Sequence, residues 1–140
     1  MDKVERRDPL QPHVHVDARH LSAPLLQLDL AEELRQVRHE LRAGTAGHVA
    51  KTLSKYDDLR TVLIAFEPGG CLDRHQTQGR VCIHVLEGSV AVRIGEQAFV
   101  LGRGGLLHVG PHVAHEVEAM EPSALLVTIA WPGASAVHAG

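Results

Sequence analysis

The chain has 140 residues, of which 44% are hydrophobic and 22% are charged, and its formal net charge is −3 at pH 7. This length and balance suit one domain with its own core and exclude a chain that is disordered throughout. No apolar run approaches the roughly 20 residues that span a bilayer, and no basic excess favours a phosphate backbone, so we expect neither a membrane nor a nucleic-acid partner.

Residues 1–24 are expected to form a polar N-terminal arm, which contains charges and prolines but no apolar stretch of signal-peptide length. We therefore expect a cytoplasmic protein in which Cys71 and Cys82 are reduced thiols. Within the arm, residues 13–16 read His-Val-His-Val. This alternation suits either an edge strand or a disordered segment, and His13 and His15 form a His-x-His pair that can bind stray metal.

Residues 25–47 are predicted to hold one amphipathic helix. Asp29 is a suitable N-cap, and Glu32 three residues later completes the pattern of a capping box. Apolar residues recur at helical spacing on one face, namely Leu30, Leu34, Val37 and Leu41. We expect this face to pack on the outside of the main domain, with Glu33 and the other charged residues turned to solvent.

From residue 48 to residue 132 the pattern changes to short strands, and residues 133–140 remain as a C-terminal tail. Glycine and proline interrupt the apolar runs every 8 to 12 residues or so, which is typical of an all-β sandwich or barrel. The expected strands are 49–56, 61–66, 81–86, 90–94, 98–101, 106–109, 113–117 and 125–129.

Two glycine-bounded segments contain histidine in a pattern that resembles a known family. The first runs from Gly69 to Gly88 and the second from Gly104 to His115, with a strand pair between them. In order and spacing they resemble the two motifs of the cupin family, and with the flanking strands the resemblance covers roughly residues 49–131. It implies a small single-domain RmlC-like cupin, an all-β jelly-roll β-barrel with the N-terminal amphipathic helix packed outside.

The resemblance also implies where a metal would bind. Cupins hold a metal with two histidines and a glutamate from the first motif and one histidine from the second. Carried over by position, His75 and His115 match the first and the last of these ligands, but Thr77 and Val81 replace the other two. Two imidazoles hold a divalent ion weakly, so the resemblance implies at most a weakly bound transition metal such as Mn, Fe, Ni or Zn.

Other residues near the first motif are candidates for a rebuilt site. Gln78 can coordinate through its amide oxygen, whereas Arg80 favours an anionic ligand; with Thr77 and Val81 they are the predicted ligand-binding residues. Ideal strand alternation from Val81 sends His84 to the opposite face. A one-residue slip in the strand would turn His84 inward, where it could serve as a third metal ligand.

These observations leave two functions open. The first is a binding protein that holds a small organic molecule in an apolar barrel with a degenerate two-histidine metal site. The second is a metal-dependent cupin enzyme of the dioxygenase, isomerase or decarboxylase type with a remodelled histidine centre. The imidazoles of His84, His108 and His112 near the motifs favour the second, and the fold itself does not decide.

We also expect a homodimer. Small cupins often form homodimers, and the outer face of the strand over residues 81–86 presents Cys82 and Leu86, which is more apolar than a solvated sheet face. An isologous two-fold pair is the commonest closed assembly.

Overall fold

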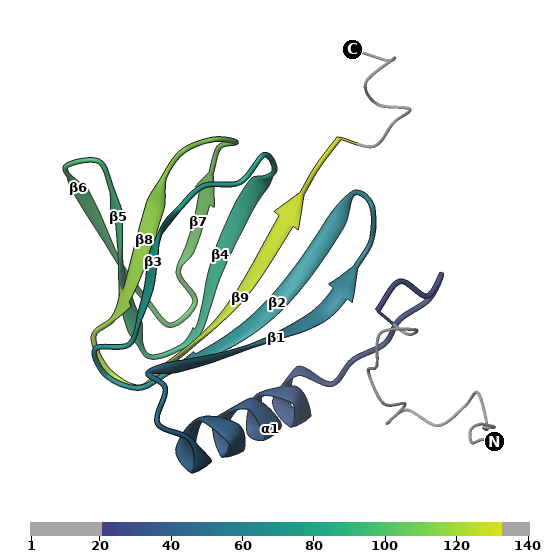
Figure 1. Ribbon diagram of the computed structural model, residues 1–140, viewed down its shortest axis with the longest axis horizontal. Helices are drawn as coiled ribbons and strands as arrows, with labels where there is room; N and C mark the ends of the chain where they lie inside the picture. The colour runs from purple at the N-terminus through teal and green to yellow at the C-terminus, as the bar shows by residue number, and fades with distance from the viewer. Residues whose placement is uncertain (1–20, 133–140) are drawn as a thin grey trace.

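The computed structural model describes residues 21–132 and folds them into two facing antiparallel sheets with one helix outside (Figure 1). The elements are α1 (Leu30–Ala43), β1 (His48–Lys55), β2 (Leu59–Phe66), β3 (Cys71–His75), β4 (Arg80–Glu87), β5 (Ser89–Ile94), β6 (Gln97–Gly102), β7 (Leu106–Val109), β8 (His115–Ala119) and β9 (Ser123–Ala130). The larger sheet has the order β1-β2-β9-β4-β7, and the smaller has the order β3-β8-β5-β6. The predicted all-β jelly-roll with an N-terminal helix is confirmed.

Two predicted segments lie outside the described residues. They are the part of the arm that holds His13 and His15, and the tail over residues 133–140. Within residues 21–132, no helix is long and apolar enough to cross a membrane.

The start of α1 is capped by Asp29 as the sequence predicts, but of the two reciprocal interactions of a capping box only the one from the N-cap side chain forms. The Asp29 carboxylate accepts hydrogen bonds from the backbone N–H groups of Ala31 and Glu32, at 3.0 and 3.3 Å. The Glu32 side chain does not return the bond, because its carboxylate accepts from Arg35 and Gln36 instead. The ion pair with Arg35 lowers the pKa of Glu32 to about 2.

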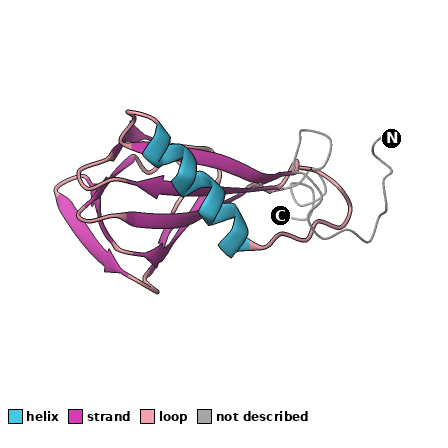
Figure 2. Ribbon diagram, turned by 90° about the horizontal axis from the view of Figure 1, so that it is seen from below, coloured by secondary structure: helices cyan, strands magenta, loops and turns pink. Residues whose placement is uncertain are grey.

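Helix α1 lies across the outer face of the larger sheet (Figure 2). Its Leu34, Val37 and Leu41 are buried in a cluster with side chains of the sheet, including Leu53, Leu63, Ala65 and Ala124. The prediction that Glu33 faces solvent is wrong: its side chain lies at the helix–sheet boundary, where Lys51 Nζ is 2.6 Å from its carboxylate. A long lysine can reach the boundary from β1 while burying its stem against apolar neighbours.

Strand β4 alternates as simple counting from Val81 predicts, without the one-residue slip that would turn His84 inward. Val81, Ile83 and Val85 are buried between the two sheets, so His84 points to the outer face. On that outer face, Leu86 packs against the cluster beneath α1 rather than remaining open to a partner. One of the two residues behind the expected homodimer is thus already covered, and the dimer stays a prediction.

Strand β3 is missing from the strands expected on sequence grounds. Its residues are mostly polar and exposed, and only Leu72 is half-buried. It forms because it pairs with β8 at the edge of the smaller sheet, with Cys71 opposite Glu118 and His75 opposite His115. A polar edge strand of this kind gives no alternating apolar signal, yet it is the strand that positions His75.

Candidate functional site

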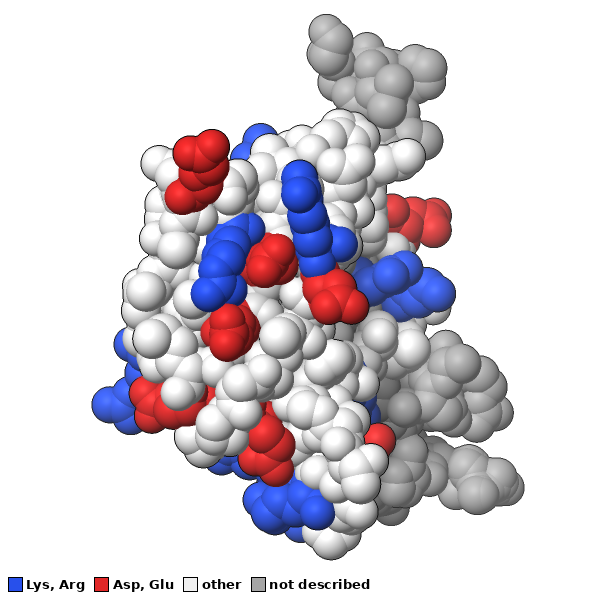
Figure 3. Space-filling view, turned by 60° about the vertical axis from the view of Figure 1, so that its left-hand side comes forward, with Lys and Arg blue, Asp and Glu red and all other residues white. Residues whose placement is uncertain are grey.

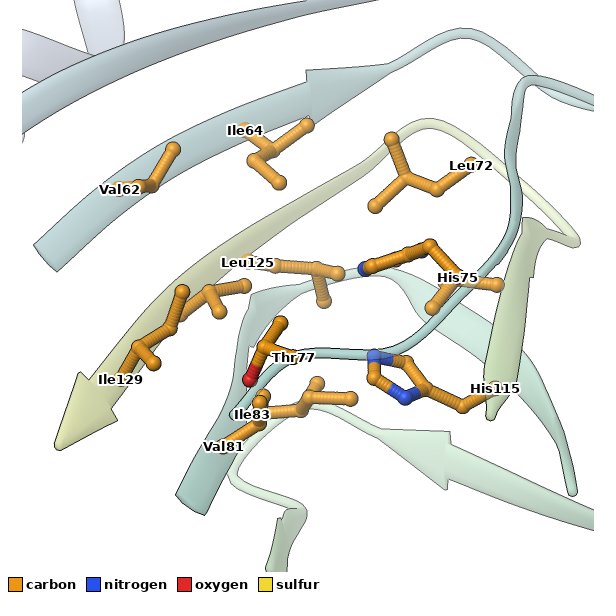
Figure 4. A pocket seen from close by; sticks show the side chains of 12 residues that line it. Val62, Ile64, Leu72, His75, Thr77, Val81, Ile83, His115, Leu125 and Ile129 are labelled. Atoms are coloured by element: carbon orange, nitrogen blue, oxygen red, sulfur yellow. The ribbon is translucent and has the colours of Figure 1, made fainter. Parts of the chain in front are cut away.

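The sandwich is hollow at one end. A cavity of about 170 Å³ lies between the sheets, where β2, β4 and β8 begin and β3 and β9 end. Aliphatic side chains from both sheets make up most of its wall (Figure 4). They are Val62, Ile64, Leu72, Val81, Ile83, Val117, Leu125, Val127 and Ile129. The remaining lining residues are His75, Thr77 and His115, so the polar groups are few and close together.

The two histidines meet because β3 and β8 are paired. His75 is the last residue of β3 and His115 the first of β8, and the two are cross-strand partners. Their ring centroids are 4.4 Å apart, and the ring planes are inclined by 58°. His75 is exposed, whereas His115 is only 3% exposed. The convergence expected from the motif positions is therefore present.

Backbone carbonyls fix the tautomer of both rings. His75 Nδ1 lies 2.8 Å from the carbonyl oxygen of Asp73, and His115 Nδ1 lies 3.0 Å from that of Val113. A carbonyl oxygen can only accept, so each Nδ1 carries the hydrogen and donates. Each neutral ring then keeps the Nε2 lone pair free to accept a hydrogen bond or to bind a metal.

Burial keeps His115 in its neutral form. Loss of solvent lowers the pKa of this imidazole below its ordinary 6.5, and the neighbouring His75 adds a smaller effect in the same direction. The Val113 carbonyl opposes this in part, because it stabilises the protonated ring. Near neutral pH the buried side of the pair therefore presents an acceptor rather than a charge.

Thr77 holds the loop beside the histidines. Its hydroxyl donates to the carbonyl of Gly79 at 3.0 Å and accepts from the N–H of Gly79 at 3.1 Å. The carbonyl of Thr77 accepts from the N–H of His112 at 2.8 Å, which ties the β3–β4 loop to the β7–β8 turn. His112 has a φ of 65°, a left-handed conformation that is uncommon for a residue other than glycine.

The structure brings together only some of the predicted site residues. His75, His115, Thr77 and Val81 all line the cavity. Gln78 is exposed at the tip of the loop. Arg80 is exposed on the outer side of β4, as alternation from the buried Val81 requires. His84 lies on the outer face as well, so the slipped register that would have made it a ligand is not adopted.

The donor set does not fit the four-ligand metal centre of cupins. Within residues 21–132, no three side chains of the types His, Cys, Asp and Glu are grouped so that they could hold a metal ion. The aliphatic Val81 occupies the glutamate position on the cavity wall, so no carboxylate balances the charge of a cation there. What remains is a pair of imidazoles, which we expect to bind a divalent ion weakly.

Sequence reasoning missed two residues at the open end, Arg60 and Trp131. The Arg60 guanidinium carbon lies 5.6 Å from the centroid of the Trp131 ring. Arg60 precedes the lining residue Val62 by two positions, and Trp131 follows the lining residue Ile129 by two. Strand alternation could have indicated both, but each lies just outside an apolar run.

Comparison with known proteins agrees with this fold. The family model for the cupin domain matches residues 62–130, and the chain belongs to the cupin family. No curated protein matches the sequence.

Three solved structures show how far the similarity extends. An RmlC-like cupin from Desulfovibrio desulfuricans is 28% identical, with a TM-score of 0.56 over 59% of this chain and 81% of that chain. An RmlC-like cupin from Shewanella frigidimarina is 26% identical, with a TM-score of 0.57 over 61% and 78%. A cupin superfamily protein from Desulfitobacterium hafniense is 17% identical, with a TM-score of 0.61 over 79% and 94%.

Proposed function

We propose that this cupin is a binding protein for a small molecule that has an apolar body and a head that donates hydrogen bonds. The observation behind the proposal is an aliphatic cavity whose wall carries two imidazoles with free Nε2 atoms. Ligand sites commonly combine an apolar lining with a few convergent polar groups that fix orientation.

The size of the cavity limits the ligand. Its volume of about 170 Å³ is close to that of an engineered apolar cavity of roughly 150 Å³ that binds benzene. A ligand of about six to ten non-hydrogen atoms would fill the space by that comparison. Burial of its apolar surface supplies most of the binding free energy, at roughly 25 cal/mol per Å².

The chemistry of the head follows from the tautomers. Because Nδ1 of both His75 and His115 faces a backbone carbonyl, the atoms left for a ligand are two Nε2 acceptors. A hydroxyl or N–H group complements them, whereas a carboxylate would place its oxygens against other lone pairs. We therefore assign the histidine pair to a ligand hydroxyl or N–H.

The other function that the sequence allows, a metal-dependent enzyme, has less support from the donor set. A divalent metal at His75 and His115 would depend on water or on the ligand for its remaining coordination positions. No carboxylate lines the cavity to compensate its charge. Weak, reversible metal binding at the pair agrees with these residues, and we derive no reaction step through it.

Matched probes test the binding function. Cyclohexanol can donate to the histidine pair, whereas methoxycyclohexane has a similar body and no donor, so calorimetry should show tighter binding of the alcohol. In a His75→Ala/His115→Ala double variant we expect the alcohol to lose about five- to tenfold in affinity, since a neutral hydrogen bond contributes about 1 kcal/mol. His39→Ala, which removes an exposed histidine of α1, is the control. Equal binding of the two probes in the native protein would contradict the assigned head group.

A further inference from the structure

The side chain of Arg60 belongs to the inner face of the larger sheet. Residues two apart on a strand share a face, so Arg60 lies on the same side of β2 as Val62 and Ile64, which line the cavity. Its cross-strand partner on β9 is Ile129, another lining residue. Paired residues of antiparallel strands project to the same side, so Arg60 stands next to the cavity at its open end.

The guanidinium is held against a rigid aromatic wall. The centroid of the Trp131 ring lies 5.6 Å from the guanidinium carbon of Arg60, in cation–π range. The backbone N–H of Trp131 donates to the carbonyl of Asp58 at 2.9 Å. The indole of Trp131 packs directly against Gly79, which has no side chain to obstruct it. A Cβ on Gly79 would lie 2.9 Å from Trp131 Nε1 and 2.8 Å from Ile129 Cγ2. The arrangement of arginine and tryptophan is thus built into the open end of the barrel.

The charge of Arg60 is not matched by the described part of the chain. Nε of Arg60 is buried and has no hydrogen-bond partner there. The ion pairs within residues 21–132 involve Arg35, Arg38, Lys51 and Arg93, and none includes Arg60. A buried donor without an acceptor is unfavourable, and a planar guanidinium is best satisfied by the two oxygens of a carboxylate.

We propose that Arg60, stacked on Trp131, forms a carboxylate-binding subsite at the mouth of the cavity, so that the ligand is a small aliphatic hydroxy acid. This inference rests on the proposed function and makes the ligand class more specific. The hydroxyl of the acid donates to the pair of His75 and His115, the chain lies along the aliphatic wall, and the carboxylate accepts from Arg60. Each end of the ligand then meets the complementary group, whereas the reverse orientation would set the carboxylate against two acceptors.

The fluorescence of Trp131 reports on this subsite directly, because the sequence contains one tryptophan. The probes are 4-hydroxybutanoate, 6-hydroxyhexanoate and 8-hydroxyoctanoate, each paired with its primary amide, which keeps the shape without the charge. For the best chain length we expect the acid to bind at least about tenfold more tightly than its amide and to change the tryptophan emission.

Three variants identify the residue responsible. Arg60→Gln should abolish the preference for the acid while the amide still binds as before, which also shows that the variant is folded. Arg60→Lys should retain part of the preference, because it keeps the charge but loses the two-pronged geometry. Arg103→Gln makes the same change in net charge at an exposed turn between β6 and β7, and it should leave the preference intact.

The outcomes distinguish failure of the carboxylate subsite from failure of the binding function. Equal affinity for acid and amide in the native protein, with both weakened in the His75→Ala/His115→Ala variant, would overturn the carboxylate subsite and leave the proposed function standing. A loss of preference in Arg103→Gln as large as in Arg60→Gln would reduce the effect to overall charge and would also overturn the subsite. Failure of every probe to bind would contradict both proposals.

Discussion

The two faces of strand β2 have similar side chains but very different packing. On the outer face, Leu63 and Ala65 are fully buried beneath α1. On the inner face, Ile64 and the half-buried Val62 line an open cavity. These four side chains are all aliphatic, so composition alone does not separate a face that stabilises the fold from one that we propose holds a ligand.

The inner face differs from the outer face because side chains fill only one end of the space that it encloses. At the closed end of the sandwich the interior is filled by Phe66, Val90 and Val92, all at most 1% exposed. At the open end the filling ends, and the polar groups of His75 and His115 converge there. On the face of the molecule that Figure 3 shows, acidic and basic side chains are interspersed. The unfilled volume is the reason we propose that a ligand binds at this end.

The largest effect that would test this contrast is on stability. Leu63→Ala should lower the free energy of unfolding by about 2–5 kcal/mol, because it opens a void in a closed cluster. Val62→Ala, one residue away on the hollow face, should cost less than about 1.5 kcal/mol, since the side chain it shortens already borders open space. Urea denaturation measures both. Equal losses would mean that the two faces are packed alike.

Filling the cavity should reduce ligand affinity more than it reduces stability. Val127→Leu adds one methylene to the cavity wall, where there is room for it, so the cost in stability should stay below about 1 kcal/mol. The same methylene occupies ligand space, and we expect the affinity for cyclohexanol to fall by about tenfold, or about 1.4 kcal/mol. Calorimetry and urea denaturation on the same preparations separate the two effects. Unchanged binding would place the ligand elsewhere.

Metal titration sharpens the assignment of the histidine pair. We expect untagged protein to bind Mn, Ni or Zn weakly and to lose the metal on dialysis against a chelator, because two imidazoles supply the protein ligands. His75→Ala and His115→Ala should each weaken binding by about tenfold, a change of about 1.4 kcal/mol. If all three proteins bind with equal affinity, the metal is not at this pair, and the His13 and His15 segment becomes the next place to test.

The sequence was sufficient to predict the part of the site that motif spacing determines. The positions of His75 and His115 fix their convergence, and the alternation of Val81, Ile83 and Val85 predicts the inward face of β4. The sequence could not predict which loop residues reach the cavity. The direction of the Gln78 side chain, which is exposed, is set by the loop geometry and not by the alternation of a strand.

Arg60 and Trp131 escaped sequence reasoning for a different reason. Arg60 belongs to β2 and Trp131 directly follows β9, far apart in the chain, and the pairing of Arg60 with Ile129 brings them together. Glu33 illustrates the same limit on the helix. Helical spacing predicted that its side chain faces solvent, whereas it is buried at the boundary with β1, where Lys51 pairs with it.

The smallest expected effect is a pH dependence that originates at the hollow end. Burial lowers the pKa of His115, so the folded protein binds this proton less readily than the unfolded chain does. The free energy of unfolding is therefore at its full value above the pKa of His115 in the unfolded chain, about 6.5. It decreases as the pH falls through the lower pKa of His115 in the folded protein. Closed clusters such as that under α1 contribute no such term, because Leu34, Val37 and Leu41 do not titrate.

Urea denaturation between about pH 7.5 and pH 5 measures this pH dependence of stability, because histidine side chains titrate in that range. The native protein should lose more stability on acidification than His115→Gln, whereas His39→Ala should behave like the native protein because that side chain is exposed. Binding of cyclohexanol should weaken over the same acidic range, since a protonated Nε2 can no longer accept its hydroxyl hydrogen. A His115→Gln variant as acid-sensitive as the native protein would show that the buried imidazole is not the source.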